Sequence, residues 1–320
     1  MSRSLVLPLQ PLPVSRPWGG RRAAPRFGWT APAATAGNGA PVGEWWLASC
    51  QPGAASPLLQ PARAAGPADL PAFLAGPGRD LGLPDAADFP LLVKFLDCEE
   101  TLSLQVHPDD ACARRQGLPR GKTECWHVLA ADPGAVVWLG TAPGVNSSQL
   151  LERVAEGASD DEIRALLRRV ELLPGDTLVV PAGSVHAIGG GLLLYEIQQN
   201  SDTTWRIHDW GRGRPVQLDR AREACLDRAP EAPVREEPLA DRWTALARTP
   251  AFGLRRARVT GGLELRPDGS FALLTVLAGQ GTLRAGDAML ALRPGATALI
   301  AGPVQLSGAG LDLLCADAPR

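Results

Sequence analysis

The chain has 320 residues, which is long enough to bury a sizeable core and to form two domains. Its 32 basic and 34 acidic residues give a formal net charge of −2, and no block of like charge stands out. This balance argues against a nucleic-acid or membrane-surface partner. The 35 glycines and 30 prolines indicate many turns between short strands.

Six cysteines are scattered along the chain, and no CxxC pair occurs. Such spacing is typical of reduced cytosolic thiols rather than of a disulfide framework or a zinc ribbon. No apolar run approaches the ~20 residues of a membrane-spanning helix, and the apolar stretch near the N-terminus is interrupted by prolines. We therefore expect a cytoplasmic protein with no membrane partner.

The first 100 residues have the pattern of short strands joined by loops. Residues 5–9 and 42–49 are strand-like, and residues 69–74 indicate a short helix. Residues 91–96, LLVKFL, form an apolar run of the kind found in strands that are covered on both faces.

Residues 102–107 alternate between apolar and polar side chains. The apolar residues would face one side of a strand, and the other side would carry Ser103, Gln105 and His107. An ordinary half-exposed strand shows the same alternation. Gln and His on the polar face, instead of Lys or Glu, favour a functional surface.

Residues 121–129, GKTECWHVL, contain two candidate ligands on one predicted strand. Side chains alternate along a strand, so Lys122 and Glu124 share one face and His127 lies on the other. Glu124 and His127 therefore cannot both point into one pocket. We choose Glu124.

Between residues 146 and 170 the periodicity becomes helical. Ser159 and Glu162 stand at capping-box spacing, and the apolar positions that follow continue the helical pattern to Val170. Asn146 begins a glycosylation triplet, but in a cytosolic protein we interpret it as a helix cap. We expect a small helical insertion at about 146–170.

The segment 181–210 concentrates residues with useful chemistry. His186 follows a turn, and the next predicted strand places Glu196 on the same face as leucines, where burial would require a partner. An exposed edge strand is the alternative. Arg206 and His208 would share a face of the following strand. Arg206 could hold a phosphate or a carboxylate, or form a structural salt bridge.

The C-terminal part has alternating strands and the turns of a β-sandwich, and it contains no histidine. We expect a first domain at 1–240 and a second at 241–320, with a charged, partly helical connector between them. Any metal site then belongs to the first domain.

Together these patterns predict an open metal site. His107, Glu124 and His186 supply two imidazoles and a carboxylate, which is a ligand set of catalytic Zn²⁺ sites, and Gln105 would add a weaker neutral oxygen. The same set suits Fe²⁺, so the ligands do not identify the metal. A structural role is the competing interpretation of each single histidine.

Three segments closely resemble type I mannose-6-phosphate isomerases, especially the short bacterial form. They are residues 91–110, 121–129 and 181–210, and residues 42–49 match less tightly. The resemblance implies a mainly β protein with two cupin-type jelly-roll β-sandwich domains, a small helical insertion and a metal-free second domain.

The resemblance also implies roles for individual residues. The family's zinc ligands match the four candidate ligands named above. Further positions of this chain match the family's active-site residues and a serine that lies near the phosphate. The implied catalytic residues are Arg206, Lys122 and Glu196; the implied substrate-binding residues are Ser103, Lys122 and Arg206; the implied metal ligands are His107, Glu124, His186 and Gln105.

The implied reaction interconverts mannose 6-phosphate and fructose 6-phosphate through a cis-enediol that Zn²⁺ stabilises. The proton-transfer base would be Glu196, Lys122 or His107. The expected partner is a small phosphorylated sugar, and the expected state is a monomer or weak homodimer. The alternatives are a cupin isomerase or epimerase for another aldose, and a sugar-binding bicupin without turnover.

Overall fold

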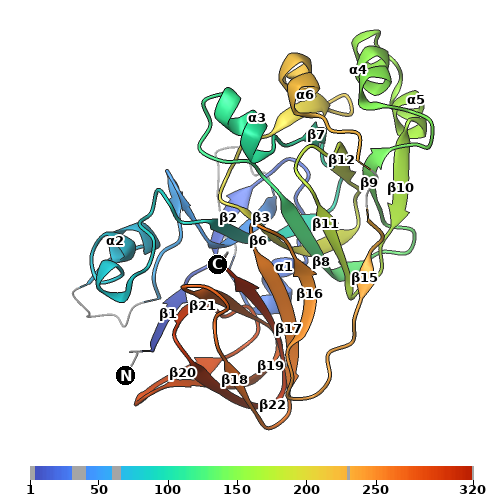
Figure 1. Cartoon of the computed structure of the whole chain (residues 1–320). Coiled ribbons are helices and arrows are strands. Elements are labelled where there is room, and N and C mark those ends of the chain that lie inside the picture. Colours follow the sequence, from blue (N-terminus) through green and yellow to red (C-terminus); the bar gives the residue numbers. More distant parts are fainter. Residues whose placement is uncertain (1–3, 31–40, 60–65, 229–230, 319–320) are drawn as a thin grey trace.

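The computed structural model describes residues 4–30, 41–59, 66–228 and 231–318, and within them strands predominate (Figure 1). The described strands form three larger sheets and a two-stranded ribbon. The prediction of a mainly β fold is confirmed. The division near residue 240 stays a prediction.

One sheet, of seven strands, carries many of the residues that line the site. Its order is β15-β11-β8-β13-β6-β3-β2, with antiparallel neighbours throughout. The strands are β2 (Leu12–Ser15), β3 (Val42–Ala48), β6 (Leu91–Cys98), β8 (Glu124–Ala131), β11 (Asp176–Val180), β13 (Leu192–Gln199) and β15 (Val234–Arg235).

Both faces of this sheet are covered, which explains its apolar strand sequences. Every residue of β6 is buried, as the run LLVKFL predicts. Along β13, Tyr195 packs in a cluster shared with the C-terminal strands, whereas Leu194 packs in a second cluster on the opposite face. Glu196 has the parity of Leu194 and therefore lies on that second face.

A five-stranded sheet packs against this second face and completes the first β-sandwich. Its strands, in the order β10-β9-β12-β7-β14, are β7 (Leu104–Val106), β9 (Val136–Thr141), β10 (Leu167–Glu171), β12 (His186–Ile188) and β14 (Trp205–His208). Because β7 begins at Leu104, Leu102 lies outside it. Leu102 packs in the core between the two sheets, not with Leu104 and Val106 as the alternation predicts.

Helices cover the outer face of the five-stranded sheet. They are α4 (Ser147–Ala155), α5 (Asp160–Ala165) and α6 (Leu218–Ala224), and α3 (Asp110–Arg115) lies at the same end of the molecule (Figure 1). Asn146 caps α4 and Ser159 forms a capping box with Glu162 at the start of α5, as predicted. The second helix ends at Ala165 instead of continuing to Val170, because the chain enters β10 to pair with β9.

Short elements complete the first part of the chain. Asp69 caps α2 (Leu70–Ala75), so the helix expected at 69–74 is present. The others are α1 (Ala23–Phe27), the 3₁₀ turn η1 (Arg79–Leu81), β4 (Cys50–Gln51) and β5 (Ala54–Ala55). No helix within the described ranges is long and apolar enough to cross a membrane.

The third sheet contains the C-terminal strands together with the first strand of the chain. It comprises β1 (Leu5–Leu9), β16 (Thr244–Arg248), β17 (Gly253–Val259), β18 (Gly262–Leu265), β19 (Ala272–Ala285), β20 (Ala288–Leu292), β21 (Thr297–Ala301) and β22 (Val304–Asp317). Its side chains pack against one another in a cluster of their own, so the sheet is curled. β19 is a single long strand with bulges.

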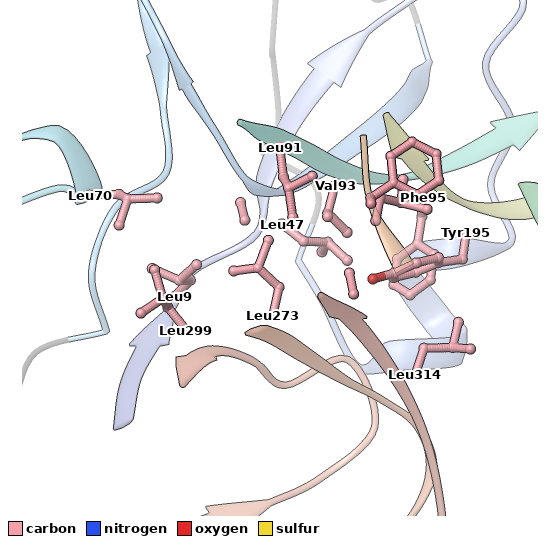
Figure 2. Packing of buried hydrophobic residues seen from close by; sticks show 14 of the residues in the cluster. Leu9, Leu47, Leu70, Leu91, Val93, Phe95, Tyr195, Leu273, Leu299 and Leu314 are labelled. Carbon is pink, nitrogen blue, oxygen red and sulfur yellow. The ribbon is translucent and has the colours of Figure 1, made fainter. Parts of the chain in front are cut away.

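A large apolar cluster joins the first sheet to this third sheet, and Figure 2 shows part of it. Leu47, Leu91 and Phe95 come from the first sheet and meet Leu273 and Leu314 of the third. All five side chains are fully buried. The third sheet therefore supports the back of the sheet whose other face carries the site.

This packing makes Leu273 important for stability. We expect Leu273→Ala to lower the free energy of unfolding by about 2–5 kcal/mol, because it leaves a cavity between two sheets. Leu239, whose side chain is largely exposed, is the control, and Leu239→Ala should change the value by less than about 0.5 kcal/mol. Urea denaturation of both variants checks this, and equal small effects would contradict it.

Candidate metal centre and active site

A cavity of about 510 Å³ is lined by residues of both sheets of the first sandwich. Its walls are rich in charged and polar side chains. They include the predicted site residues Ser103, Gln105, Lys122, Glu124, Glu196 and Arg206. Residues from four separate parts of the sequence thus meet in one space.

Three strands bring the predicted metal ligands together. His107 follows β7, Glu124 begins β8 and His186 begins β12. The Nε2 atoms of His107 and His186 lie 3.2 and 3.7 Å from the two carboxylate oxygens of Glu124. The three side chains are buried, and their ligand atoms all lie within 4.8 Å of one another. They form a group that could hold a metal ion.

Backbone carbonyls set the tautomer of both imidazoles. His107 Nδ1 lies 2.9 Å from the carbonyl oxygen of Thr203, and His186 Nδ1 lies 3.0 Å from that of Ser184. A carbonyl only accepts hydrogen bonds, so each Nδ1 carries the proton. Each Nε2 then keeps its lone pair for the space beside Glu124. Such support is usual for metal-binding histidines.

Burial also favours the protonation states that a metal site needs. It lowers the pKa of His107 to about 3 and lowers that of His186, so both rings are neutral near pH 7. Burial alone would raise the pKa of Glu124. The charge of Lys122, whose Nζ lies 3.0 Å from Glu124 Oε1, opposes this, and the pKa falls well below its ordinary value. Two neutral imidazoles and a carboxylate fit a divalent cation.

Gln105 lies at the edge of this triad. Its Nε2 is 3.2 Å from His186 Nε2, and its Oε1 accepts a hydrogen bond from Ser103 Oγ at 3.3 Å. Its amide therefore lies beside the triad. A ligand role for Gln105 stays a prediction.

His127 lies on the opposite face of β8, as strand parity predicts. Its Nδ1 lies 2.9 Å from Thr177 Oγ1, and the ring is buried. Cys125, on the same face, packs in the cluster shared with the C-terminal strands. His127 is thus separated from the cavity by the sheet.

Glu196 is buried and paired at the floor of the cavity. Lys94 Nζ lies 2.8 Å from its Oε2, and Trp126 Nε1 donates to its Oε1 at 2.8 Å. Because β13 lies between β8 and β6, the alternative of an exposed edge strand is wrong. Burial raises the pKa of Glu196, the charge of Glu124 adds to this, and Lys94 opposes it.

Sequence reasoning missed Lys94 and Glu44, which extend the charged floor. Lys94 Nζ lies 3.9 Å from Glu44 Oε2, the same oxygen that accepts the Trp46 indole N–H at 2.6 Å. Arg16 binds both oxygens of Glu44, at 3.0 and 3.2 Å. Arg16, Glu44, Lys94 and Glu196 thus alternate in charge across neighbouring strands. The available signal was a lysine inside the otherwise apolar run 91–96.

The prediction that Arg206 and His208 share a face is wrong. A bulge shifts the register of β14, so that Arg206 lies opposite Gln105 and His208 opposite Leu104. Arg206 consequently lines the cavity. His208 instead contacts Asp160 at the start of α5, with its Nε2 2.7 Å from a carboxylate oxygen.

The fold and the site define a class of protein. It is a mainly β protein of the cupin type, in which a β-sandwich encloses a buried His–Glu–His group beside a charged cavity.

Comparison with known proteins narrows the class to one family. The family model for the type I phosphomannose isomerase catalytic domain matches residues 6–124. The mannose-6-phosphate isomerase of Streptococcus mutans is 33% identical over 287 residues, covering 87% of this chain and 86% of the relative. A probable mannose-6-phosphate isomerase of Bacillus subtilis is 31% identical over 295 residues, covering 86% of each.

A solved structure of a mannose 6-phosphate isomerase has a similar fold. The crystal structure of the mannose 6-phosphate isomerase from Bacillus subtilis has a TM-score of 0.79 with 26% identity, covering 97% of this chain and 99% of that one. The chain belongs to the type I mannose-6-phosphate isomerase family.

The metal triad can be tested by metal analysis alone. We expect His186→Ala to lower bound metal from about one ion per chain to less than about a tenth, because it removes one of three strong ligands. His127→Gln, which changes a buried histidine of the opposite face, should keep the full metal content. Atomic emission spectroscopy of dialysed protein measures both. A His186→Ala variant that retains a full ion would refute the ligand set.

Glu44 should make stability depend on pH. Burial would raise its pKa, but Lys94 and Arg16 outweigh burial and lower the pKa from 4.5 to about 2. A carboxyl group with a lowered folded-state pKa contributes stability above its unfolded value of 4.5, and this is lost as the pH falls toward 2. The stability difference between the wild type and Glu44→Gln should therefore shrink from pH 6 to pH 3 in urea denaturation. A constant difference would contradict it.

Proposed function

We propose that the protein interconverts mannose 6-phosphate and fructose 6-phosphate. The observation that carries the proposal is a cavity lined by a buried glutamate and several cations, with a candidate metal triad beside it, in a chain of the mannose-6-phosphate isomerase family. The expected substrate is thus a small phosphorylated sugar.

The proposed cofactor is one divalent metal ion. His107, Glu124 and His186 would hold it, with Gln105 as a fourth ligand, and Zn²⁺ is our first choice from the donor set. Fe²⁺ accepts the same donors. When bound, the ion supplies positive charge that stabilises negative charge on the sugar oxygens in the transition state.

The reaction needs a base that moves a proton between two neighbouring carbons. One proton leaves C2 of the open-chain aldose and returns at C1, while a second passes from the C2 oxygen to the C1 oxygen. Aldose and ketose share the intervening cis-enediol. No oxidant or reductant is consumed, because the electrons stay within the sugar.

Among the three candidate bases we propose Glu196. His107 Nδ1 donates a hydrogen bond to the Thr203 carbonyl, and its Nε2 faces Glu124. A His107 that binds the metal through Nε2 has no nitrogen left to act as the base. Lys122 is paired with Glu124. Glu196 lines the cavity, and burial raises its pKa toward the working pH, as a general base requires.

Lys94, Lys122 and Arg206 would supply fixed positive charge around the substrate. Burial would lower the pKa of Lys94, but Glu196 and Glu44 outweigh it and raise the pKa, so the ammonium stays protonated. It can donate a hydrogen bond to an oxygen that becomes negative beside Glu196. Ser103, Lys122 and Arg206 are the proposed substrate-binding residues, and all three line the cavity.

We also propose a cytoplasmic location, supported by the scattered spacing of the six cysteines. The expected monomer or weak homodimer stays a prediction, which sedimentation analysis would check.

A coupled assay on chelated and then zinc-restored protein tests the function. We expect turnover of mannose 6-phosphate to disappear with the metal and to return with Zn²⁺. Turnover of another aldose alone would indicate the isomerase or epimerase alternative. A raised melting temperature with mannose 6-phosphate but no turnover would indicate the sugar-binding bicupin.

Replacing the proposed base should separate chemistry from metal binding. We expect Glu196→Gln to lower kcat by about 10²–10⁴-fold while one metal ion per chain is kept, because the amide cannot accept the proton. Glu152→Gln, an exposed change on α4, is the control and should leave kcat within about twofold. Normal kcat in Glu196→Gln would exclude Glu196 as the base.

A further inference from the structure

The residues that follow β14 form a tight turn, 209–214, which carries two further arginines. Trp210, Gly211 and Gly213 have φ angles of +52°, +75° and +78°. Glycine adopts this conformation freely, but for a bulky tryptophan it is strained. The Trp210 indole N–H donates to the carbonyl oxygen of Leu102 at 2.6 Å, which ties the turn to the cavity wall. Tertiary contacts thus enforce an unusual backbone here.

Asp209 organises the turn from a buried position. The backbone N–H of Arg214 donates to its Oδ2 at 2.8 Å, and Arg214 Nε donates to its Oδ1 at 2.9 Å. Arg206 Nε lies 3.8 Å from the same Oδ1. Two guanidinium groups therefore share one carboxylate oxygen, and both residues line the cavity.

The chain then returns beside β14 and fixes Arg206 as well. Arg206 Nη1 donates to the carbonyl oxygen of Pro215 at 2.7 Å. The backbone N–H of Gln217 donates to the Arg206 carbonyl at 2.8 Å, and the Arg206 N–H donates to Gln217 Oε1 at 2.9 Å. Turn and strand together hold Arg206 and Arg214 as a pair before any ligand binds.

Arg206 and Arg214 lie in a region where positive charge exceeds negative charge. Arg206, Arg212 and Arg214 surround the single carboxylate of Asp209. Glu100 lies 3.9 Å from Arg212 but its side chain is mostly exposed, where solvent screens its charge. Asp202 also lines the cavity and is likewise exposed. A dianion placed against the pair would balance the repulsion among the guanidinium groups.

We propose that Arg214 binds the phosphate of the sugar substrate together with Arg206, and that Asp209 is the positioning residue that sets the two side chains. The identity of the anion as a sugar phosphate rests on the proposed function. The planar forks of two arginines suit phosphate oxygens, which accept paired hydrogen bonds. An unphosphorylated sugar leaves the pair without a partner, so the site selects phosphorylated substrates.

Arg214→Gln tests the phosphate contact with two readouts, the KM for mannose 6-phosphate and the dissociation constant of inorganic phosphate. Each should rise by about tenfold or more, while kcat changes by less than about threefold, because the contact is lost equally in ground and transition states. Phosphate binding is measured with and without metal, because the ion can also bind phosphate. The control is Arg222→Gln on α6, an equal charge change at an exposed arginine, which should shift both values by less than about twofold.

Asp209→Asn tests the positioning role, because charge and geometry predict opposite results. If Asp209 only opposed the anion electrostatically, its neutralisation would tighten phosphate binding. We expect weaker binding, with a higher KM and little change in kcat, since a neutral amide with one accepting oxygen holds the two guanidinium groups less firmly than the carboxylate does. Tighter binding would overturn the positioning role. Should this variant not fold, Arg214→Lys decides: it keeps the charge but loses the clamp, so it should bind phosphate more weakly than the wild type.

The readouts also separate this inference from the proposed function. Loss of phosphate binding in Arg214→Gln, in a protein without isomerase activity, would support the anion site and refute the reaction. An active enzyme whose affinity for phosphate is unchanged in Arg214→Gln would overturn the anion site alone.

Discussion

Charge buried in a sheet must be paired, and the way in which this chain pairs its buried charges determines the structure of the site. The strands β8, β13, β6 and β3 are covered on both faces, yet the face toward the cavity carries Glu124, Glu196, Lys94 and Glu44. An unpaired charge there would cost several kcal/mol, so each stands beside a partner of opposite sign. Antiparallel pairing places Glu196 beside Lys94, whereas Glu124 has its partner, Lys122, two residues earlier in the chain. The result is a preorganised polar floor whose hydrogen bonds and charges are set before substrate arrives.

The other face of the same sheet explains why the floor can be rigid. Its side chains join the cluster with the C-terminal strands, where Phe89 stacks on Phe271 with ring centroids 5.0 Å apart. A sheet exposed on that face would be free to twist and to slip in register. The C-terminal sheet carries none of the candidate metal ligands, and its contribution to the site is mechanical: it fixes the strands that hold Glu124 and Glu196.

Sequence reasoning succeeded where strands are regular and failed where they are not. Strand parity distinguished Glu124 from His127, because β8 keeps its alternation through both residues. The same rule failed at His208, since one bulge in β14 reverses the face. Lys94 and Glu44 were missed because their partners are distant in sequence, and one charged residue in a strand does not reveal a partner. Arg214 was missed because its position depends on a left-handed Trp210, a conformation that the sequence pattern does not predict.

The pairing of β1 with β21 has a consequence for how the chain folds during synthesis. The partner strand of β1, Thr297–Ala301, is made long after β1 itself. A nascent chain therefore leaves the ladder between β1 and β21 unformed until β21 emerges, and loop closure over such a distance is slow. Leu9 of β1 and Leu299 of β21 both pack in the apolar cluster behind the site. Closure of that cluster thus waits for β21, so a ribosome-bound nascent chain that lacks this strand lacks part of the support of the first sheet.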